Sequence, residues 1–312
     1  GLGQISTPNR HHAHDHQCRH CALSLWIWAC NRAPRVLVDA DLYPCRSGVS
    51  LGATQLKGSA QMTFSGKTVL ITGASRGIGA ATAHHLAALG ANVVLTARSA
   101  QALEQLAADI GPQAKAIACD VSDYDQVKAA VDLAVAQFGG LDILVNNAGL
   151  LAPVHRVADF APKDWDQVID VNVKGVFYMM HAALPNMIAK GGGTILNISS
   201  GAAYGVLEGW SHYCASKAAV LQLPRSGHEE YAAQGITCLG LSPGTVATDM
   251  QVLIKASGVN PVSKLDVSDH IPASDVAEAI AYLCGPAGAD FAGEDFHLKA
   301  PESRAVIGLP AR

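Results

Sequence analysis

Two residues in the C-terminal half, Tyr213 and Lys217, have types and a spacing that suit proton transfer. They lie four positions apart in a stretch predicted to be helical, so both side chains leave one face of the helix, one turn apart. A free phenol has a pKa of about 10, which is too high for a base at neutral pH. A neighbouring ammonium favours the phenolate and lowers that pKa, so the pair predicts a general acid/base centre.

A glycine-rich turn is the second feature with chemical meaning. The apolar run 68–72 leads directly into Gly73, Gly77 and Gly79, and an alanine-rich stretch predicted to be helical over 80–89 follows. Glycines let the backbone turn sharply and approach a ligand closely, and the start of a helix presents N–H groups and a positive dipole end to an anion. A strand, a turn and a helix in this order predict a site for the pyrophosphate of a dinucleotide.

Four motifs stand in an order that resembles the short-chain dehydrogenase/reductase family. They are Gly73-x-x-x-Gly77-x-Gly79, Asn146-Asn-Ala-Gly149, Tyr213-Cys-Ala-Ser-Lys217 and Ser242-Pro-Gly-Thr245. The resemblance covers residues 62 to about 296. It implies an oxidoreductase that transfers hydride between a nicotinamide coenzyme and a ketone or secondary alcohol, with Tyr213 as the general acid/base.

The resemblance also assigns roles to further residues. It implies that Ser200 orients the substrate carbonyl, with Ser199 as the adjacent alternative, and that Asn172 extends a proton relay from Lys217. No metal site is expected. His212, beside the tyrosine, is expected to point off the Tyr–Lys face as an ordinary surface or pocket residue. The residues expected at the coenzyme are Gly73, Ser75, Arg76, Gly77, Ile78, Gly79, Arg98, Asp120, Val121, Asn147, Ala148, Gly149, Tyr213, Lys217, Pro243, Gly244, Val246 and Thr248.

The body of the chain alternates between strand and helix patterns. Further strands are predicted at 92–96, 114–119, 142–146, 194–199 and 236–241, and helices between them, notably at 123–138 and 163–188. This alternation predicts an α/β fold, a Rossmann-type doubly wound parallel sheet in a single domain with a short substrate-lid segment. Ligands of such sheets bind beyond the carboxyl ends of the strands, where all four motifs fall.

The end of the second predicted strand bears on the choice of coenzyme. An acid there would bind the adenosine ribose hydroxyls and repel a 2′-phosphate, but this strand ends in Ala97-Arg98. Arg98 and Arg76 can bind such a phosphate through charge-assisted hydrogen bonds. The sequence therefore favours NADP(H), with NAD(H) possible; the alternative is that both arginines are solvated surface residues. Asp120, after the third strand, matches the family's adenine-contacting acid, although Asp is also a common turn residue.

The composition divides the chain near Met62. The 312 residues are 49% hydrophobic and 15% charged, whereas ordinary domains carry roughly 25% charge. Residues 1–61 hold six basic and three acidic side chains, so the total charge of −4 divides into +3 for this leader and −7 for residues 62–312. We expect the leader to be a disordered or non-native extension. Its histidines and cysteines leave open a zinc site, and its apolar run 21–30 leaves open a secretory signal.

Charge and hydropathy also restrict the partners. A net negative body disfavours nucleic acid and anionic membrane surfaces. The most apolar early stretch, 21–30, is half of the about 20 residues that a transmembrane helix needs. Eight scattered cysteines favour reduced thiols in the cytoplasm. The expected partners are a small-molecule carbonyl or alcohol substrate and, from the resemblance, further copies of the chain in a homodimer or tetramer.

Two segments depart from the family's pattern. Pro224 falls where the family continues a long helix that packs in the oligomer interface, and proline in a helix interior costs about 3 kcal/mol. We expect a kink after Leu221, which weakens the prediction of an oligomer. The tail 296–312 lacks the family's Val-Asp-Gly-Gly ending, so the contacts that this ending makes are in doubt.

Substrate choice is expected to lie in the segment 250–270, which is predicted to close as a lid. The surroundings of Trp210 resemble the sepiapterin and benzil reductase branch, which implies a vicinal dicarbonyl; the alternative is a packing role for this side chain. A 3-oxoacyl thioester is another possible substrate class, although no basic patch for an acidic carrier is evident. From a different class, a catalytically idle dinucleotide-sensing regulator would keep the same fold, but Ser200, Tyr213 and Lys217 are all intact.

Overall fold

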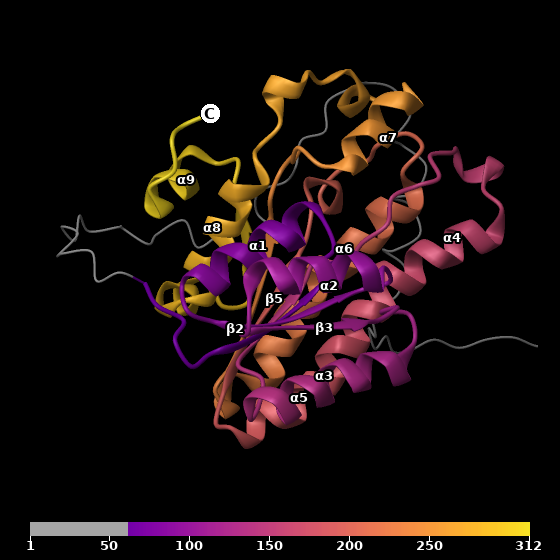
Figure 1. The fold of residues 1–312 in the computed structure, drawn as a ribbon. Coiled ribbons are helices and arrows are strands. Elements are labelled where there is room, and N and C mark those ends of the chain that lie inside the picture. The colour runs from indigo at the N-terminus through magenta and orange to yellow at the C-terminus, as the bar shows by residue number, and fades with distance from the viewer. Residues whose placement is uncertain (1–61) are drawn as a thin grey trace, which may run out of the picture. The chain divides into compact units, whose positions relative to one another are not determined.

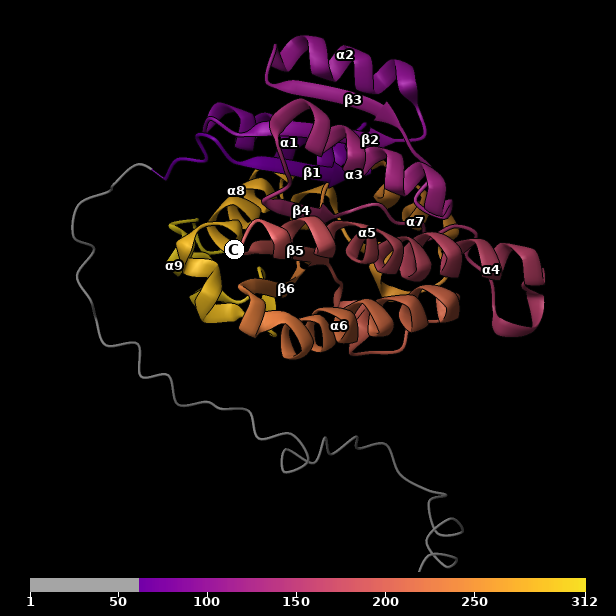
Figure 2. The same cartoon turned by 90° about the horizontal axis from the view of Figure 1, so that it is seen from below.

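A computed structural model describes residues 62–312, and the predictions for residues 1–61 lie outside this range. The described part contains one seven-stranded parallel sheet with the order β3-β2-β1-β4-β5-β6-β7, which Figure 2 shows from β3 to β6. The strands are β1 Thr68–Thr72, β2 Asn92–Ala97, β3 Ala114–Ala118, β4 Ile143–Asn146, β5 Gly193–Ile198, β6 Ile236–Ser242 and β7 Asp295–His297. The prediction of a doubly wound α/β sheet is confirmed.

Helices cover both faces of this sheet. They are α1 Gly77–Ala88, α2 Ala100–Ile110, α3 Tyr124–Phe138, α4 Pro162–Ile169, α5 Gly175–Ala189, α6 Ser211–Tyr231, α7 Asp249–Ser257, α8 Ala273–Cys284 and α9 Pro301–Ile307. Side chains of α1, α2 and α8 form one core layer with the strands, and those of α3, α5 and α6 form the other. Figure 1 shows α1 and α8 on one side of the strands and α3 and α5 on the other.

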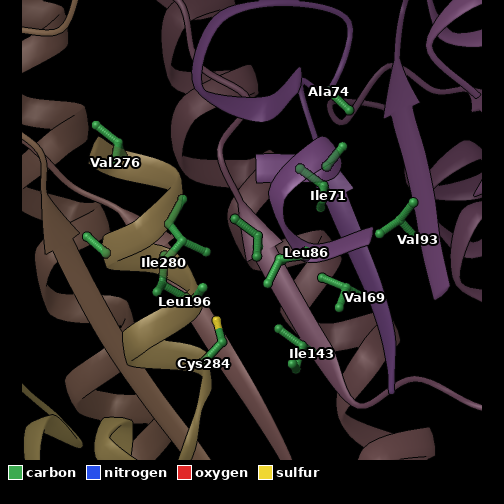
Figure 3. Close-up of a cluster of buried hydrophobic side chains, with 14 of the residues drawn as sticks. Val69, Ile71, Ala74, Leu86, Val93, Ile143, Leu196, Val276, Ile280 and Cys284 are labelled. Atoms are coloured by element: carbon green, nitrogen blue, oxygen red, sulfur yellow. The ribbon is translucent and has the colours of Figure 1, made fainter. Parts of the chain in front are cut away.

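The hydrophobic core explains why the central strands show no alternation of polar and apolar residues. Every residue of β1 and β4 is buried, because helices cover both faces. On the α1–α8 side, Leu86 and Ile280 lie among Ile71 and Leu196 of the sheet (Figure 3). The carboxyl ends of the strands are thereby held at one edge, where the loops carry the candidate site.

The largest differences from the sequence predictions concern two helices and one strand. The first helix begins at Gly77 rather than residue 80, inside the glycine turn. The helix predicted over 163–188 consists of α4 and α5 joined by a π-helical segment, Asp170–Lys174. One further strand, β7, was not predicted, because it has only three residues and so no detectable period.

The predicted kink after Leu221 does not end the helix. α6 continues through the buried Pro224 to Tyr231, although proline has no N–H to bond the carbonyl group of Val220. The tail also packs against the fold. Arg304 of α9 is 1% exposed, and its Nη2 lies 2.6 Å from a carboxylate oxygen of Asp275. Within residues 62–312, no helix is both long and apolar enough to span a bilayer.

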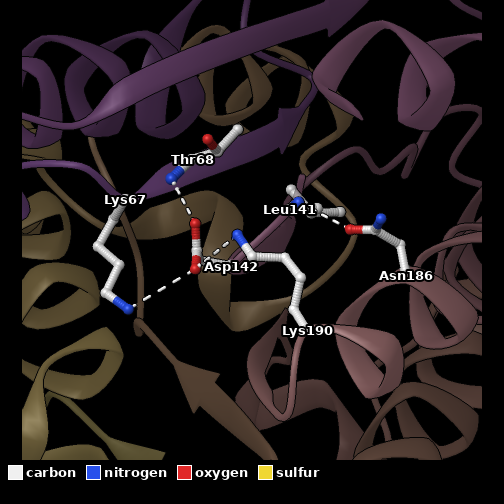
Figure 4. A network of polar contacts seen from close by, with 6 residues as sticks. All are labelled: Lys67, Thr68, Leu141, Asp142, Asn186 and Lys190. Carbon is white, nitrogen blue, oxygen red and sulfur yellow. Dashed lines mark hydrogen bonds and ion pairs between the residues drawn. The ribbon is translucent and has the colours of Figure 1, made fainter. Parts of the chain in front are cut away.

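A polar network joins the amino ends of the central strands, away from the candidate site. The Asp142 carboxylate accepts a hydrogen bond from the backbone N–H of Thr68 at 2.9 Å, and the ammonium groups of Lys190 and Lys67 lie 2.9 and 3.6 Å from it (Figure 4). Burial alone would raise the pKa of Asp142, but the Thr68 N–H and the two lysines lower it below its usual range. The carboxylate therefore ties β1 to β4.

We expect Asp142→Asn to lower the free energy of unfolding by about 1–3 kcal/mol at neutral pH, because it removes the charge that pairs with two lysines. The folded pKa lies below the unfolded value of about 3.9, so the contribution is full above that pH and is lost as the pH falls through the folded pKa. Urea unfolding from pH 7 to pH 2 measures this difference. Asp132→Asn, which breaks an exposed pair with Lys128, is the control; equal losses for both variants would contradict the assignment.

Candidate active site

The glycine turn after β1 has the backbone geometry that a phosphate site needs. Gly73 and Gly77 have φ angles of +64° and +55°, which favour glycine. A Cβ atom on Gly79 would clash with the carbonyl oxygen of Gly73 and lie 2.8 Å from the side-chain nitrogen of Asn147. The turn is therefore lined by backbone, and α1 begins within it, so the first N–H groups of the helix face the turn without intrahelical partners.

Side-chain hydrogen bonds fix this turn to the loop after β4. The hydroxyl oxygen of Thr72 accepts hydrogen bonds from the backbone N–H groups of Asn147 and Ala148, both at 2.9 Å. The Asn147 amide donates to the carbonyl oxygens of Thr72 and Gly73 at 2.8 and 3.2 Å. β1 and β4 are neighbours at the point where the strand order reverses, which is where such sheets bind dinucleotides. The residues present thus fit a dinucleotide.

All the residues predicted to bind the coenzyme follow the carboxyl ends of strands or lie on α6 beside them. The turn after β1 contributes six residues, and the loops after β2, β3, β4 and β6 contribute the others. By segment, they are 73 and 75–79 after β1; 98 after β2; 120 and 121 after β3; 147–149 after β4; 213 and 217 on α6; and 243, 244, 246 and 248 after β6.

The two arginines expected at a 2′-phosphate differ in their surroundings. An Nη atom of Arg76 lies 3.2 Å from the Asp249 carboxylate in an exposed ion pair, of a kind worth at most about 1 kcal/mol. Arg98 follows β2, is exposed, and makes no ion pair within residues 62–312. Asp120 accepts hydrogen bonds from the backbone N–H and the hydroxyl of Ser122, at 3.0 and 2.6 Å.

Tyr213 and Lys217 lie side by side on the buried face of α6. The side chains are within one helical turn, and the Lys217 ammonium nitrogen lies 5.7 Å from the centre of the Tyr213 ring. Both residues are at least nine-tenths buried. The ammonium donates a 2.7 Å hydrogen bond to the carbonyl oxygen of Ile198 at the end of β5, so the sheet fixes its position.

Burial controls the proton affinities of this pair. It lowers the pKa of Lys217 to about 8, a shift that Asp295 opposes. It raises the pKa of Tyr213 to about 12, while a hydrogen bond with Ser200 acts in the opposite direction. The sequence-based expectation of a lowered phenol pKa is therefore not met by the described residues alone, because loss of hydration outweighs the other effects.

The structure separates the two serines after β5. Ser200 lies close to the Tyr213 hydroxyl and caps the short helix 201–203, where its hydroxyl oxygen accepts a hydrogen bond from the Ala202 N–H at 3.2 Å. Ser199 is turned the other way and donates a 2.5 Å hydrogen bond to the carboxylate of Asp295 on β7. Ser200, rather than Ser199, therefore faces the tyrosine.

Asn172 lies in the π-helical segment between α4 and α5. Its amide oxygen accepts a hydrogen bond from the Leu150 N–H at 2.7 Å, and its amide nitrogen donates to the Leu150 carbonyl and to the Ser216 hydroxyl at 2.8 and 2.9 Å. A Cβ atom placed on Gly149 would lie 3.5 Å from the Asn172 amide oxygen and 3.9 Å from the Lys217 ammonium. The glycine therefore lies between these two groups.

His212 and Trp210 lie at the start of α6 and face the interior. Of the two positions expected for His212, surface or pocket, burial excludes the surface: the residue is fully buried, its Nε2 atom lies 2.7 Å from the Leu151 carbonyl oxygen, and its ring packs on Phe160. Trp210 contacts Tyr213 edge to face, with ring centres 5.5 Å apart. Its indole N–H is buried without a hydrogen-bond partner among the described residues.

The segment expected to be a lid, 250–270, contributes to the apolar cluster around Trp210 and Tyr213. Ile254 of α7 is 2% exposed and packs with Trp210 and Tyr213, whereas Val252 and Leu253 on the same helix are exposed. Sequence reasoning missed a further residue near the site, Asp295, because its strand, β7, is only Asp-Phe-His and has no periodic pattern to detect. No cluster of three or more potential metal ligands is present within residues 62–312.

This fold and this site define a dinucleotide-dependent oxidoreductase, and comparisons identify its relatives. The sequence profile of short chain dehydrogenases matches residues 67–257. A 3-oxoacyl-(acyl-carrier-protein) reductase of Staphylococcus aureus is 35% identical over 237 residues, covering 74% of this chain and 96% of the relative. A reductase with the same name from Haemophilus influenzae is 34% identical over 236 residues, covering 75% and 96%.

Solved structures give the same result. A 3-ketoacyl-(acyl-carrier-protein) reductase from Brucella melitensis, solved with NADH, has a TM-score of 0.67 and 31% identity, and the match covers 76% of this chain and 98% of that one. A 7α-hydroxysteroid dehydrogenase, solved with NADH and 7-oxo glycochenodeoxycholic acid, has a TM-score of 0.70 and 31% identity, with 78% and 96% covered. The chain belongs to the short-chain dehydrogenase family. It is an NAD(P)-dependent oxidoreductase that acts on CH–OH or ketone groups.

Proposed function

We propose that Tyr213 is the general acid/base of a carbonyl reductase or alcohol dehydrogenase, with Ser200, Lys217 and Asn172 as its partners. The observation that carries the proposal is the burial of the Lys217 ammonium beside the Tyr213 phenol, with Ser200 at the phenol hydroxyl. When bound, the nicotinamide coenzyme donates or accepts the hydride at the substrate carbon. A catalytically idle regulator would have no use for this arrangement.

In the reductive direction, the phenol O–H of Tyr213 donates its proton to the substrate carbonyl oxygen as the carbonyl becomes an alcohol. The Ser200 hydroxyl donates a hydrogen bond to the same oxygen and stabilises the negative charge that develops there. Tyr213 is left as phenolate, which the adjacent ammonium stabilises. In the oxidative direction, the phenolate accepts the proton of the alcohol.

Lys217 then supplies the proton that restores Tyr213. Its ammonium is held by the Ile198 carbonyl, and the Asn172 amide lies across Gly149 from it. The Asn172 amide oxygen accepts from the Leu150 N–H, and its nitrogen donates to the Leu150 carbonyl and the Ser216 hydroxyl, so these bonds hold the π-helical segment in place. We propose that Asn172, in this segment, extends a proton relay from Lys217 toward solvent.

Tyr213→Phe is expected to lower kcat by about 10²- to 10⁴-fold, because it removes only the proton-transferring hydroxyl. Oxidation of NADPH by a panel of ketones and diketones, followed by its absorbance, measures the effect. Tyr231→Phe, at the far end of the same helix, is the matched control. Retained turnover in Tyr213→Phe would refute the assigned role, and absence of turnover in the unaltered chain would favour the regulator.

We propose a preference for NADP(H) over NAD(H). Arg98 supports it, because it is exposed at the end of β2 without an ion-pair partner within residues 62–312, and no acid occupies this position. Arg76 supports it less, because its guanidinium pairs with Asp249. The relatives solved with NADH show that the other coenzyme can occupy related sites.

Arg98→Ala is expected to weaken NADPH binding on the order of tenfold, since a charge-assisted contact to the 2′-phosphate is lost. NADH binding should not change, because NADH has no phosphate at that position. Fluorescence titration of both coenzymes against the same protein gives the two dissociation constants. An equal change for both coenzymes would contradict a phosphate contact.

The substrate is proposed to be a small ketone or the corresponding secondary alcohol. The apolar cluster of Leu151, Ala202, Trp210 and Ile254 around Tyr213 supports an apolar substrate body, and α7 with the following segment to residue 270 is proposed as the lid. The similarity to 3-oxoacyl reductases favours one specific alternative, a 3-oxoacyl thioester, which belongs in the same substrate panel. The resemblance of the residues around Trp210 to the sepiapterin and benzil reductase branch still predicts a vicinal dicarbonyl substrate.

We further propose that the chain forms a homodimer or tetramer and works in the cytoplasm. Phe177 on α5 is 49% exposed and lies among the rings of Tyr178, His181 and Tyr124, which supports a self-association surface. Continuity of α6 through Pro224 also supports it. The four cysteines within residues 62–312 are free thiols, in keeping with a reducing compartment.

A further inference from the structure

A buried carboxylate lies behind the catalytic residues and has no part in the mechanism above. The side chain of Asp295 on β7 is 2% exposed. One carboxylate oxygen accepts the 2.5 Å hydrogen bond from the Ser199 hydroxyl, and the other accepts a 3.0 Å hydrogen bond from the Tyr204 hydroxyl. A third group, Nε2 of the half-exposed His297, lies 3.8 Å from the second oxygen.

These contacts hold both ends of the loop that carries Ser200. Ser199 immediately precedes Ser200, and Tyr204 follows the short helix 201–203. Both hydroxyls donate to one carboxylate that belongs to a strand on the far side of β6. The loop is thereby anchored to β7 at two points, and Ser200 lies between them with its hydroxyl toward Tyr213.

The negative charge of Asp295 also acts on the pKa of Lys217. Burial lowers the pKa of Lys217, and Asp295 is the one charged group that opposes this shift among the described residues. Burial raises the pKa of Asp295 itself, while the Ser199 hydroxyl, His297, the Tyr204 hydroxyl and Arg225 of α6 favour its ionised form. Glu294, immediately before β7, is the other acid near this cluster.

We propose that Asp295 is a positioning residue for the hydride-transfer reaction: its carboxylate anchors the Ser200 loop through Ser199 and Tyr204. The charge of the same carboxylate favours the ammonium form of Lys217. This inference rests on the proposed function, because it assigns Asp295 to the same catalytic group. It adds a residue from the edge strand β7, which none of the sequence motifs includes. The two contributions, anchoring and charge, can be separated by two variants.

Asp295→Asn keeps the size of the side chain, an acceptor for Ser199 and a polar group for Tyr204, but removes the charge. Tyr204→Phe keeps the charge and removes one anchor. The first measurement is an NMR titration of the Lys217 side chain, labelled with ¹³C at Cε and assigned with Lys217→Arg, in the chain without coenzyme or substrate. The second is the pH profile of kcat/KM for ketone reduction with NADPH.

Asp295→Asn is expected to move the Lys217 titration from about pH 8 to lower pH, because loss of a nearby negative charge makes the ammonium release its proton more easily. The alkaline limb of kcat/KM should move in the same direction. Tyr204→Phe should leave the Lys217 titration in place and lower kcat by about 10- to 100-fold, the effect of a misplaced catalytic group.

An unchanged Lys217 titration in Asp295→Asn would contradict an effect of the Asp295 charge on Lys217. An unchanged kcat in Tyr204→Phe would contradict the anchoring of the Ser200 loop by Asp295. A merely structural aspartate would lower thermal stability without moving either pH dependence. Should Asp295→Asn fail to fold, Asp295→Ser replaces it in the same titration. Because the titration needs no turnover, it tests the charge contribution even if the unaltered chain reduces no ketone, an outcome that would refute only the proposed function.

Discussion

The Lys217 ammonium loses nearly all its hydration in the fold and donates a hydrogen bond to the carbonyl oxygen of Ile198. A buried charge of this kind needs compensation, and the end of β5 and the charge of Asp295 supply it. The same desolvation raises the pKa of Tyr213, so the phenol is not poised to act as a base by itself. The site depends on holding the Lys217 ammonium and the Tyr213 phenol together where water is excluded.

The parallel sheet makes this possible because its strands end at one edge. β1 and β4 provide the glycine turn and the loop bonded to it by Thr72 and Asn147. β5 provides the carbonyl for Lys217 and the loop with Ser200, and β7 provides the carboxylate that holds this loop. Residues far apart in the sequence thus meet because the order of the strands, rather than local propensity, sets their distances.

The strands and the place of the candidate site in the fold were largely predictable from the sequence, for a physical reason. Buried strands such as β1 are apolar along their whole length, and the glycine turn and the Tyr213–Lys217 spacing are local patterns. The resemblance favoured Ser200 over Ser199, but the contact that turns Ser199 away was not predictable, because its partner, Asp295, is 96 residues away. The burial of His212 and the continuation of α6 through Pro224 likewise follow from tertiary packing, which overrides local preference.

Ionisation of the Tyr213 phenol tests the account most directly. Difference absorbance between the unaltered chain and Tyr213→Phe follows this single group as the pH rises. Without coenzyme, the midpoint should lie near the pKa of about 12 that burial imposes. Saturation with NADP⁺ should move it to lower pH, because a positive charge in the site favours the phenolate. A midpoint that NADP⁺ leaves unchanged would contradict the assignment of Tyr213 as the proton-transferring group beside the coenzyme.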